Sequence, residues 1–528
     1  MQDRQRVYVL LLIFILLLLS VLVRLINLQI FNHSFYVGKS QDQHTRIIEL
    51  AAQRGDIVDR NGNILSTSID TYSLYKYKHG WLARKLPLAE AEKIREQEPL
   101  KIALLKEKKR LYPKERVAAQ LLGFVGLDNQ GLSGVELSFD EYLCGKKGRL
   151  VTEGDPSGVE LYGALRVLEA GEEGMNITLT IDENIQYVAE REIEKQIKKY
   201  QAISGTVIVM DAETGEILAL ASKPDFDPNA YKSADKRLWH PRVVDPFEPG
   251  STFKTITTAI ALEEGVISEE TMLEAKDSIT VGGRVIKNSH AINWPDSRIT
   301  ISKMLEESIN TGAVQIGLKL GPEKFYNGIK KFNFGSSTAF GLYGESKGIV
   351  NHWQRWHKPD IAMITFGQSI AVTPMQLLAA FSAFTNQGEI VKPFLIKKIE
   401  SCDGKFVKGN ARQLWGRAVS AKVADQVKKL LQNVVEIGTG KLGRITGFSV
   451  AGKTGTAQKA SPGGRGYLQG HYIASFIGFA PVKDPKVICL VIVDDPRGKY
   501  WGATVCGPVF KDVVEYSLRY LNVKPDVL

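Results

Sequence analysis

Hydrophobic residues dominate the start of the chain. After Arg4 and Arg6, residues 7–26 are apolar apart from Ser20 and Arg24. About 20 such residues span the hydrocarbon core of a bilayer, whereas the helix of a soluble core would show a polar face. No small-x-small cleavage site follows, which favours an uncleaved signal anchor over a signal peptide. The basic start predicts a cytoplasmic tail at 1–6, a transmembrane anchor at 7–26 and the rest of the chain outside.

The region that follows the anchor alternates between charged and apolar stretches. Residues 54–65 show a strand-like alternation that leads into an Asn-Gly turn, which predicts a hairpin. Residues 88–98 and 101–110 are rich in Lys, Glu, Leu and Ala and predict two helices, interrupted by Pro99. The charged run at 106–110 is then expected to be a solvated helix face.

A more regular pattern begins near residue 176. Asp182 is a good N-cap for an amphipathic helix, and tight polar turns join apolar strands in pairs. This pattern predicts an α+β fold, with an antiparallel sheet flanked by helices at residues 176–525, preceded by an elongated mixed α/β module at 31–175. The expected elements are strands at 177–181, 205–210, 217–222, 473–480 and 487–493, and helices at 182–199 and 509–521.

Composition narrows the possible functions. The chain has 528 residues, enough for two or three domains, and a formal charge of +10 that favours anionic surfaces. No dense Lys/Arg run interleaved with aromatic residues is present, which argues against nucleic acid. The four cysteines are scattered, and no H-E-x-x-H spacing occurs, so neither a disulfide framework nor a metal site is expected. Cys489 lies in an apolar run and is expected to be a buried, inert thiol.

The segment from Glu248 to Lys254 is the first candidate for chemistry. Pro249 and Gly250 break the chain, and Ser251 follows just before an apolar stretch that favours a helix. A serine in the first helical turn has its hydroxyl at the positive end of the helix dipole, and Lys254 shares its helix face one turn later. A serine becomes a nucleophile when a base takes its proton, and a neutral lysine can be that base. Alone, Ser-x-x-Lys recurs by chance in a chain of this length.

Two later segments carry polar side chains at useful spacings. Ser308 and Asn310 lie two residues apart in an expected turn, where one could relay a proton and the other orient an amide. Alone, this tripeptide fits a loop between two helices equally well. The run Lys453-Thr454-Gly455-Thr456 suits a strand edge, with a cation and two hydroxyls placed to hold a carboxylate.

These three elements, in this order, resemble the motif set of class B penicillin-binding proteins, the D,D-transpeptidases of peptidoglycan. The middle element departs from the commonest form, with Ile309 where Asp is usual. Residues 54–65, 131–137 and 372–377 resemble further signatures of the class, so the resemblance covers nearly the whole chain. It implies the penicillin-binding, serine-transpeptidase fold for residues 176–525, and a pedestal or dimerisation-type module before it.

The resemblance also implies roles for single residues. Ser251 would attack the D-Ala–D-Ala carbonyl of a stem peptide and form an acyl-enzyme, which an amine of a neighbouring stem resolves. Lys254 would be the general base, kept neutral by burial and by the charge of Lys453. The other implied roles are proton relay by Ser308, amide binding by Asn310, binding of the terminal carboxylate by Thr454 and Thr456 beside Gly455, and an oxyanion hole from the backbone N–H groups of Ser251 and Thr456.

The implied partners are peptidoglycan stem peptides, β-lactam antibiotics, a multi-spanning glycan polymerase of the SEDS (FtsW-like) type, and other membrane proteins of the divisome. No metal, organic cofactor or nucleic acid is implied. The location would be the cytoplasmic (inner) membrane, with a single pass and a periplasmic or extracytoplasmic catalytic domain. Glu248 and the stretches 453–458 and 472–481 resemble the septal, division-type enzyme more than the elongation type. An elongation or sporulation enzyme is the alternative.

Three functions other than transpeptidation also fit parts of the sequence. Residues 447–454 fit the phosphate-loop pattern G-x-x-x-x-G-K-[ST], but such a loop must open a helix, and Pro462 with its neighbouring glycines leaves little room for one. A β-lactam sensor or hydrolase would use the same three elements, yet no motif for a deacylating base is evident. A non-catalytic scaffold would not need all three elements in order.

Overall fold

The computed structural model describes residues 2–50, 52–76, 79–97, 102–153, 167–169, 171–291, 297–461 and 466–527. The chain forms two compact units, and each is assembled from segments that are distant in the sequence. Unit 1 consists of Met1–Gln53, Ile69–Lys109 and Gly145–Glu173, and unit 2 of Arg54–Ser68, Arg110–Cys144 and Gly174–Leu528.

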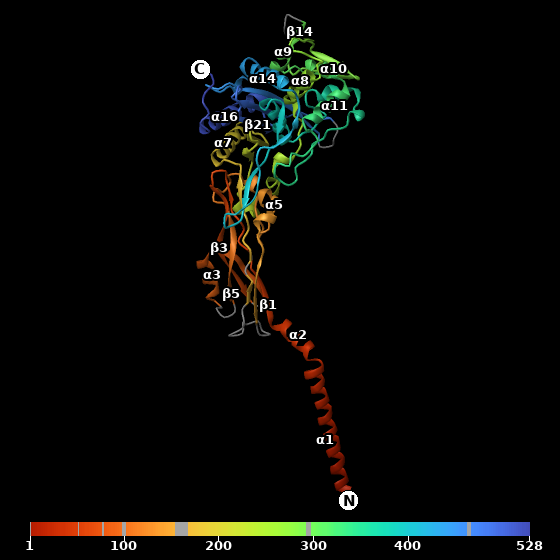
Figure 1. Cartoon of the computed structure of the whole chain (residues 1–528), viewed down its shortest axis with the longest axis vertical. Coiled ribbons are helices and arrows are strands. Elements are labelled where there is room, and N and C mark those ends of the chain that lie inside the picture. Colours follow the sequence, from red (N-terminus) through yellow and green to blue (C-terminus); the bar gives the residue numbers. More distant parts are fainter. Residues whose placement is uncertain are drawn as a thin grey trace. The chain divides into compact units, whose positions relative to one another are not determined.

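Unit 1 begins with the apolar helix that the sequence predicts. Helix α1 (Gln2–Ile26) continues into the π-helix η1 (Asn27–Phe31), and helix α2 (His33–His44) follows (Figure 1). The stretch Asp3–Phe31 is 29 residues long, apolar and not covered by any other part of the protein. By length and composition it can cross a membrane.

Two small sheets make up the rest of unit 1. Strands β1 (Thr45–Leu50), β6 (Gly148–Glu153) and β7 (Val167–Glu169) pair in that order, antiparallel. The second half of β3 (Ile64–Lys76) pairs with β4 (Gly80–Leu86) and β5 (Ile102–Leu111), and α3 (Leu88–Arg95) packs Ala91 against Leu74 and Ile102.

The prediction of a helix at 101–110 is wrong, because this segment forms strand β5. Its composition favours a helix, but pairing with β3 and the burial of Ile102 override that preference. The charged run is therefore not a solvated helix face. Lys106 and Lys108 both form ion pairs with Asp70 of β3, with N–O distances of 2.8 and 2.7 Å.

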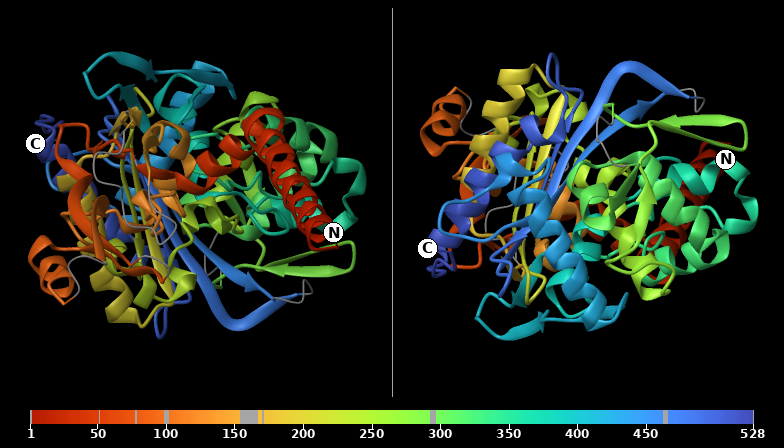
Figure 2. Two further views of the ribbon diagram at one scale, coloured as in Figure 1. Left: turned by 90° about the horizontal axis from the view of Figure 1, so that it is seen from below. Right: turned by 90° about the horizontal axis from the view of Figure 1, so that it is seen from above.

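A five-stranded antiparallel sheet forms the centre of unit 2. Its order is β10 (Ile217–Lys223), β9 (Ser204–Asp211), β21 (Val487–Asp494), β20 (Tyr467–Ala480) and β19 (Ala451–Ala460). Because side chains alternate along a strand, each strand supplies two cores. Val207 and Val209 join the core under α7 and α16, whereas Ile208 and Met210 join the larger core on the other face. In the right-hand view of Figure 2, helices lie on both faces of this sheet.

The predicted α+β architecture is confirmed, including both hairpins of the central sheet. The predicted helix at 182–199 is α7, whose N-cap Asp182 accepts the N–H groups of Asn184 and Ile185. The helices of unit 2 are α4 (Ala119–Leu122), α5 (Gly134–Ser138), α6 (Asp140–Leu143), α7 (Glu183–Tyr200), α8 (Phe253–Glu263), α9 (Ile301–Glu306), α10 (Asn310–Leu320), α11 (Pro322–Lys331), α12 (Lys358–Ile364), α13 (Pro374–Thr385), α14 (Ala421–Glu436), α15 (Gly502–Val505) and α16 (Gly507–Tyr520).

A second sheet of unit 2 contains the predicted hairpin at 54–65. Strand β2 (Ile57–Val58) pairs antiparallel with the start of β3 across a turn in which Gly62 has a φ of +89°. The sheet continues through β8 (Asn176–Leu179) and β16 (Ile396–Glu400) to β17 (Phe406–Gly409). The remaining elements are β11 (Met272–Glu274), β12 (Ser278–Val281), β13 (Arg284–Lys287), β14 (Arg298–Thr300), β15 (Glu389–Val391), β18 (Leu414–Arg417), and the 3-10 helices η2 (Pro228–Ser233), η3 (Lys236–Leu238), η4 (Arg242–Val244), η5 (Gly250–Thr252), η6 (Trp353–Arg355) and η7 (Lys441–Gly443).

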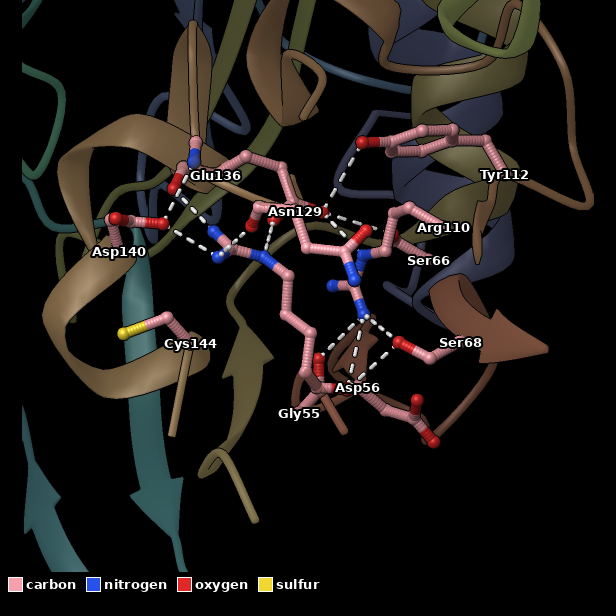
Figure 3. A network of polar contacts seen from close by, with 12 residues as sticks. Gly55, Asp56, Ser66, Ser68, Arg110, Tyr112, Asn129, Glu136, Asp140 and Cys144 are labelled. Carbon is pink, nitrogen blue, oxygen red and sulfur yellow. Dashed lines mark hydrogen bonds and ion pairs between the residues drawn. The ribbon is translucent and has the colours of Figure 1, made fainter. Parts of the chain in front are cut away.

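A buried ion network links two of the segments that resemble family signatures. The carboxylate of Glu136 lies between Nε of Arg54, at 2.5 Å, and Nε of Arg110, at 2.7 Å (Figure 3). Ser66 and Tyr112 donate hydroxyl hydrogen bonds to the same carboxylate. Burial acts to raise the pKa of Glu136, but the two guanidinium groups outweigh it and hold the pKa below its usual value. Glu136 is therefore a fully buried, charged anchor of unit 2.

Candidate active site

The first chemical element forms a tight turn that opens a helix, as the sequence predicts. Gly250 has a φ of +59°, which favours glycine, and its N–H donates to the carbonyl of Gly367 at 3.0 Å. Ser251 lies in η5, which runs directly into α8. Its half-buried side chain lines a cleft of about 740 Å³. Ser251 therefore stands at the start of a helix with access to a ligand-sized space.

Side chains from all three candidate elements meet around Ser308. The amine of Lys254 donates to the carbonyl of Ser308 at 2.5 Å and contacts its hydroxyl oxygen at 3.2 Å. The amine of Lys453 donates to the same hydroxyl at 2.9 Å. Ser308 itself has a φ of +57°, a left-handed backbone that turns its carbonyl and hydroxyl toward the two amines. One serine thus bridges the lysines of α8 and β19.

Both lysines are held in a state unusual for an amine. Their side chains are fully buried and form no ion pair among the described residues. Burial, and after it the charge of Lys453, keeps the pKa of Lys254 well below its ordinary value. Burial alone lowers the pKa of Lys453 to about 7. A neutral amine near pH 7 can accept a proton, which is the property that a general base requires.

Asn310 is fixed by a residue that the sequence analysis missed. The side-chain oxygen of Asn288 accepts the N–H groups of Asn310 and Thr311, at 2.9 and 3.0 Å, and so caps the start of α10. The side-chain amide of Asn310 donates to the carbonyl of Lys287 at 2.9 Å, which leaves its oxygen available to a ligand. Because Asn288 precedes α10 by more than twenty residues, no local capping pattern could reveal it.

The third element lies on the edge strand of the central sheet, as predicted. Strand β19 pairs on one side with β20, with Lys453 opposite Ile477. A Cβ on Gly455 would lie 2.2 Å from Oγ of Ser475 and 3.1 Å from the carbonyl oxygen of Pro249, so only glycine fits here. Thr456 accepts the N–H of Gly502 at 3.1 Å and lines the cleft. Since this segment is a strand, the phosphate-loop alternative is wrong.

The hydroxyl of Thr454 also lines the cleft, and it lies 3.3 Å from the hydroxyl of Thr439. Two aromatic residues form a wall nearby. The rings of Tyr472 and Tyr500 stack with centroids 4.1 Å apart, and both line the cleft with Trp501. Single aromatic residues carry no sequence signal, because their pairing depends on the turn between β21 and α15.

Glu248 connects the nucleophile turn to its surroundings. One carboxylate oxygen accepts the N–H of Ser369 at 3.0 Å and the hydroxyl of Tyr467 at 3.2 Å. Burial raises the pKa of Glu248, although these two bonds and the charge of Arg284 act against it. Glu248 therefore braces the segment before Ser251 against β20.

The described residues hold no group of three or more His, Cys, Asp or Glu side chains suited to a metal ion. Cys489 is buried, as expected, and burial raises the pKa of its thiol. What the cleft offers is a serine, two buried amines, an amide and two threonine hydroxyls. This set fits acyl transfer through a serine ester.

Comparison with known proteins points to the same chemistry. The family described as "Penicillin binding protein transpeptidase domain" matches residues 205–515, and "Penicillin-binding Protein dimerisation domain" matches residues 73–179. The chain is 31% identical to Stage V sporulation protein D of Bacillus subtilis, covering 97% of this chain and 86% of the relative. It is 30% identical to peptidoglycan D,D-transpeptidase FtsI of Escherichia coli, covering 95% and 89%. Penicillin-binding protein 3 of Mycobacterium tuberculosis, solved with aztreonam, superposes with a TM-score of 0.74 at 28% identity, covering 91% and 99%.

Proposed function

Because the chain belongs to the class B penicillin-binding proteins, which are peptidoglycan D,D-transpeptidases, we propose that its reaction runs through an acyl-enzyme on Ser251. The observation that carries this assignment is the contact of Lys254 and Lys453 with Ser308 beside the serine turn. It unites three elements that are far apart in the sequence.

In the acylation step, neutral Lys254 takes the proton of the Ser251 hydroxyl. The serine oxygen then bonds to the penultimate D-Ala carbonyl carbon of the donor stem. The N–H groups of Ser251 and Thr456 stabilise the oxyanion. The C–N bond breaks, and Ser308 passes a proton from the lysine pair to the departing D-Ala amine. An oxyanion donor of this kind is worth about 10²–10³-fold in rate.

In the second step, the amine of an acceptor stem attacks the ester carbonyl and gives a proton to the neutral lysine pair through Ser308. The bond to Ser251 then breaks, and the serine oxygen takes up that proton. The hydroxyls of Thr454 and Thr456 hold the terminal carboxylate of the donor before D-Ala leaves. Gly455 lets the strand approach the serine turn closely enough for this contact. The oxygen of Asn310 accepts the amide N–H of the donor stem.

The nucleophile can be tested by mass. Intact protein incubated with benzylpenicillin should gain one drug mass, and peptide mapping should place it on Ser251. The Ser251→Ala variant should gain nothing, while Ser268→Ala, an exposed serine beyond α8, should behave as the parent. An adduct on Ser251→Ala would show that another residue is the nucleophile. Rapid turnover of nitrocefin in place of a lasting adduct would favour a hydrolase.

We also propose that the N-terminus lies in the cytoplasm, because Arg4 and Arg6 precede the apolar helix. Cys402 is exposed in unit 2 and serves as a reporter. A membrane-impermeant maleimide added to spheroplasts should label the parent protein more than Cys402→Ser. Equal labelling of the two, with labelling of Cys402 only after lysis, would reverse the orientation.

For cellular role, we propose septal synthesis in partnership with an FtsW-like glycan polymerase, with the helix and unit 1 as contact surfaces. Support comes from the similarity to FtsI and from an uncovered apolar helix. The similarity to a sporulation protein is of the same degree, so depletion must decide. Depletion should yield filaments; rounded cells would favour elongation, and a defect confined to spores would favour sporulation. Co-purification with the polymerase should be lost when the anchor is exchanged and unit 1 removed.

A further inference from the structure

We propose that the β12–β13 hairpin carries a carboxylate subsite, in which Arg284 or Lys287, on opposite faces of β13, binds an anionic group of a stem peptide other than the terminal carboxylate. The inference rests on the proposed function, because it names a second anchoring point for the same substrate class.

The cleft extends well past the reacting groups. Besides Ser251 and the β19 threonines, it is lined by the continuous run of residues 284–290, which comprises β13 and the turn after it. A volume of about 740 Å³ is at the upper part of the range for sites that enclose drug-sized ligands. A dipeptide end fills a fraction of that space, so the hairpin wall is placed to contact residues of the stem nearer the glycan or an incoming second stem.

This wall is cationic. Arg284, Lys287 and His290 are exposed, and none of them forms an ion pair with a carboxylate in the described part of the chain. Glu307 is the one acidic residue among the described cleft-lining residues, and its carboxylate is already bound by Lys303 at 2.9 Å. Cations that face a concave site without a counter-ion attract an anionic ligand.

Arg284 also lies close enough to Glu248 for its charge to act on that carboxylate, yet no ion pair of 4 Å or less joins them. Ser369 and Tyr467 both bind Oε1 of Glu248, and Oε2 has no hydrogen-bond partner among the described residues. Because the guanidinium group of Arg284 forms no hydrogen bond or ion pair among the described residues, its donors are available to a ligand, and its planar fork matches a carboxylate in a bidentate manner.

The hairpin is held in place, which makes it suitable for binding. Ile286 is buried in a small cluster with Val314, Met363 and Phe366. The next residues are tied to the catalytic turn, because Lys287 accepts the amide of Asn310 and Asn288 caps α10. A ligand carboxylate bound by Arg284 or Lys287 therefore has a fixed position relative to the groups that hold the reacting amide. Because the hairpin is already ordered, binding costs little conformational entropy.

The ligand chemistry is a free carboxylate on the peptide side of peptidoglycan. It could belong to the donor stem that acylates Ser251 or to the acceptor stem that brings the amine. The two sources differ in the kinetic step they affect. A donor contact changes formation of the acyl-enzyme, whereas an acceptor contact changes its partition between water and amine.

The test uses the full-length protein in detergent, with thioester stem analogues as donors and stem peptides as acceptors. Each donor and acceptor is made in two forms, with the side carboxylate free or converted to the carboxamide. The variants are Arg284→Ala, Lys287→Ala, the double variant and Arg284→Lys. Lys422→Ala, on the exposed face of α14, is the matched control.

We expect the double variant to raise KM for the free carboxylate form of one substrate by about tenfold, as loss of a charge-assisted hydrogen bond requires. The carboxamide form should change less than twofold, as should kcat and acylation by benzylpenicillin. Arg284→Lys should recover part of the loss. The arm that responds identifies the donor or the acceptor as the source.

Equal effects on carboxylate and carboxamide forms, or no effect on either, would overturn the subsite. A misfolded variant is recognised by loss of penicillin acylation, and the single variants then carry the test. If the parent protein itself forms no adduct on Ser251, the proposed function fails instead, so the two failures are distinguishable.

Discussion

Replacing Lys453 with Met should make the protein more stable near neutral pH while it removes activity. The amine is fully buried, and burial lowers its pKa from 10.5 to about 7. Between these two values the unfolded chain binds more protons than the folded one, so the unfavourable contribution of the amine is complete below pH 7 and fades toward pH 10.5. Methionine has a similar length and no charge to bury.

The size of the effect follows from these values. At 1.36 kcal/mol per pKa unit, burial of the amine costs about 5 kcal/mol well below pH 7 and about 4 kcal/mol at pH 7, where half of the folded molecules have lost the proton. Methionine forfeits the hydrogen bonds to the hydroxyl of Ser308 and the carbonyl of Thr454, worth about 1 kcal/mol each. The net gain should be about 2 kcal/mol at pH 7 and should vanish near pH 9, by the same arithmetic.

The assay is urea unfolding of the full-length protein in mild detergent, followed by tryptophan fluorescence at pH 7, 8 and 9. Lys422→Met, at an exposed position of α14, controls for the loss of a lysine. Acylation by benzylpenicillin should fall by about 10² or more, because Lys453 contacts the catalytic serine relay. A variant that is no more stable than the parent at pH 7, or whose gain is independent of pH, would refute the reasoning.

Three further outcomes are expected. Acylation by benzylpenicillin should decline on acidification as Lys254 is protonated, with a midpoint well below the ordinary lysine value of 10.5, since burial and Lys453 lower its pKa; a stopped-flow midpoint near 10.5 would contradict this. Asn288→Ala should slow acylation about tenfold, whereas Asn288→Asp, which keeps the accepting oxygen, should retain most of the rate; equal losses would leave Asn288 a structural residue only. Glu136→Gln should lower the free energy of unfolding by about 3–5 kcal/mol, because buried Arg110 loses its counter-charge and Arg54 keeps only that of Asp140; a change under about 1 kcal/mol in urea titrations would refute the role.

Local chemistry explains which parts of the fold could be predicted. Helix α7 has its capping residue within the segment itself, and the hairpin of β9 and β10 has its turn between two apolar runs. The helix predicted for the segment of strand β5 was wrong, because the residues of this segment favour a helix by composition but pair with β3 in the folded protein. Arg110 looked like a solvated charge for the same reason, since Glu136 follows it by 26 residues.

The candidate site was predicted mainly from the resemblance to a known family, and much less from the spacing and chemistry of the residues. The Ser-x-x-Lys spacing fixes one helix face, but nothing local brings Lys453 to within hydrogen-bond distance of Ser308. Asn288 and the Tyr472–Tyr500 stack lie outside every motif, because their roles depend on contacts between segments. Residues that act through a neighbour leave no pattern in a single sequence.

Strand β19 ends the central sheet, and its second edge lies along η5 with Thr454 and Thr456 on the cleft. A free strand edge recognises an extended backbone, whatever side chains that backbone carries. A donor stem bound as proposed would therefore be recognised on this edge through its backbone and its terminal carboxylate. The same geometry keeps the edge recessed beside the serine turn, where another folded protein cannot pair with it.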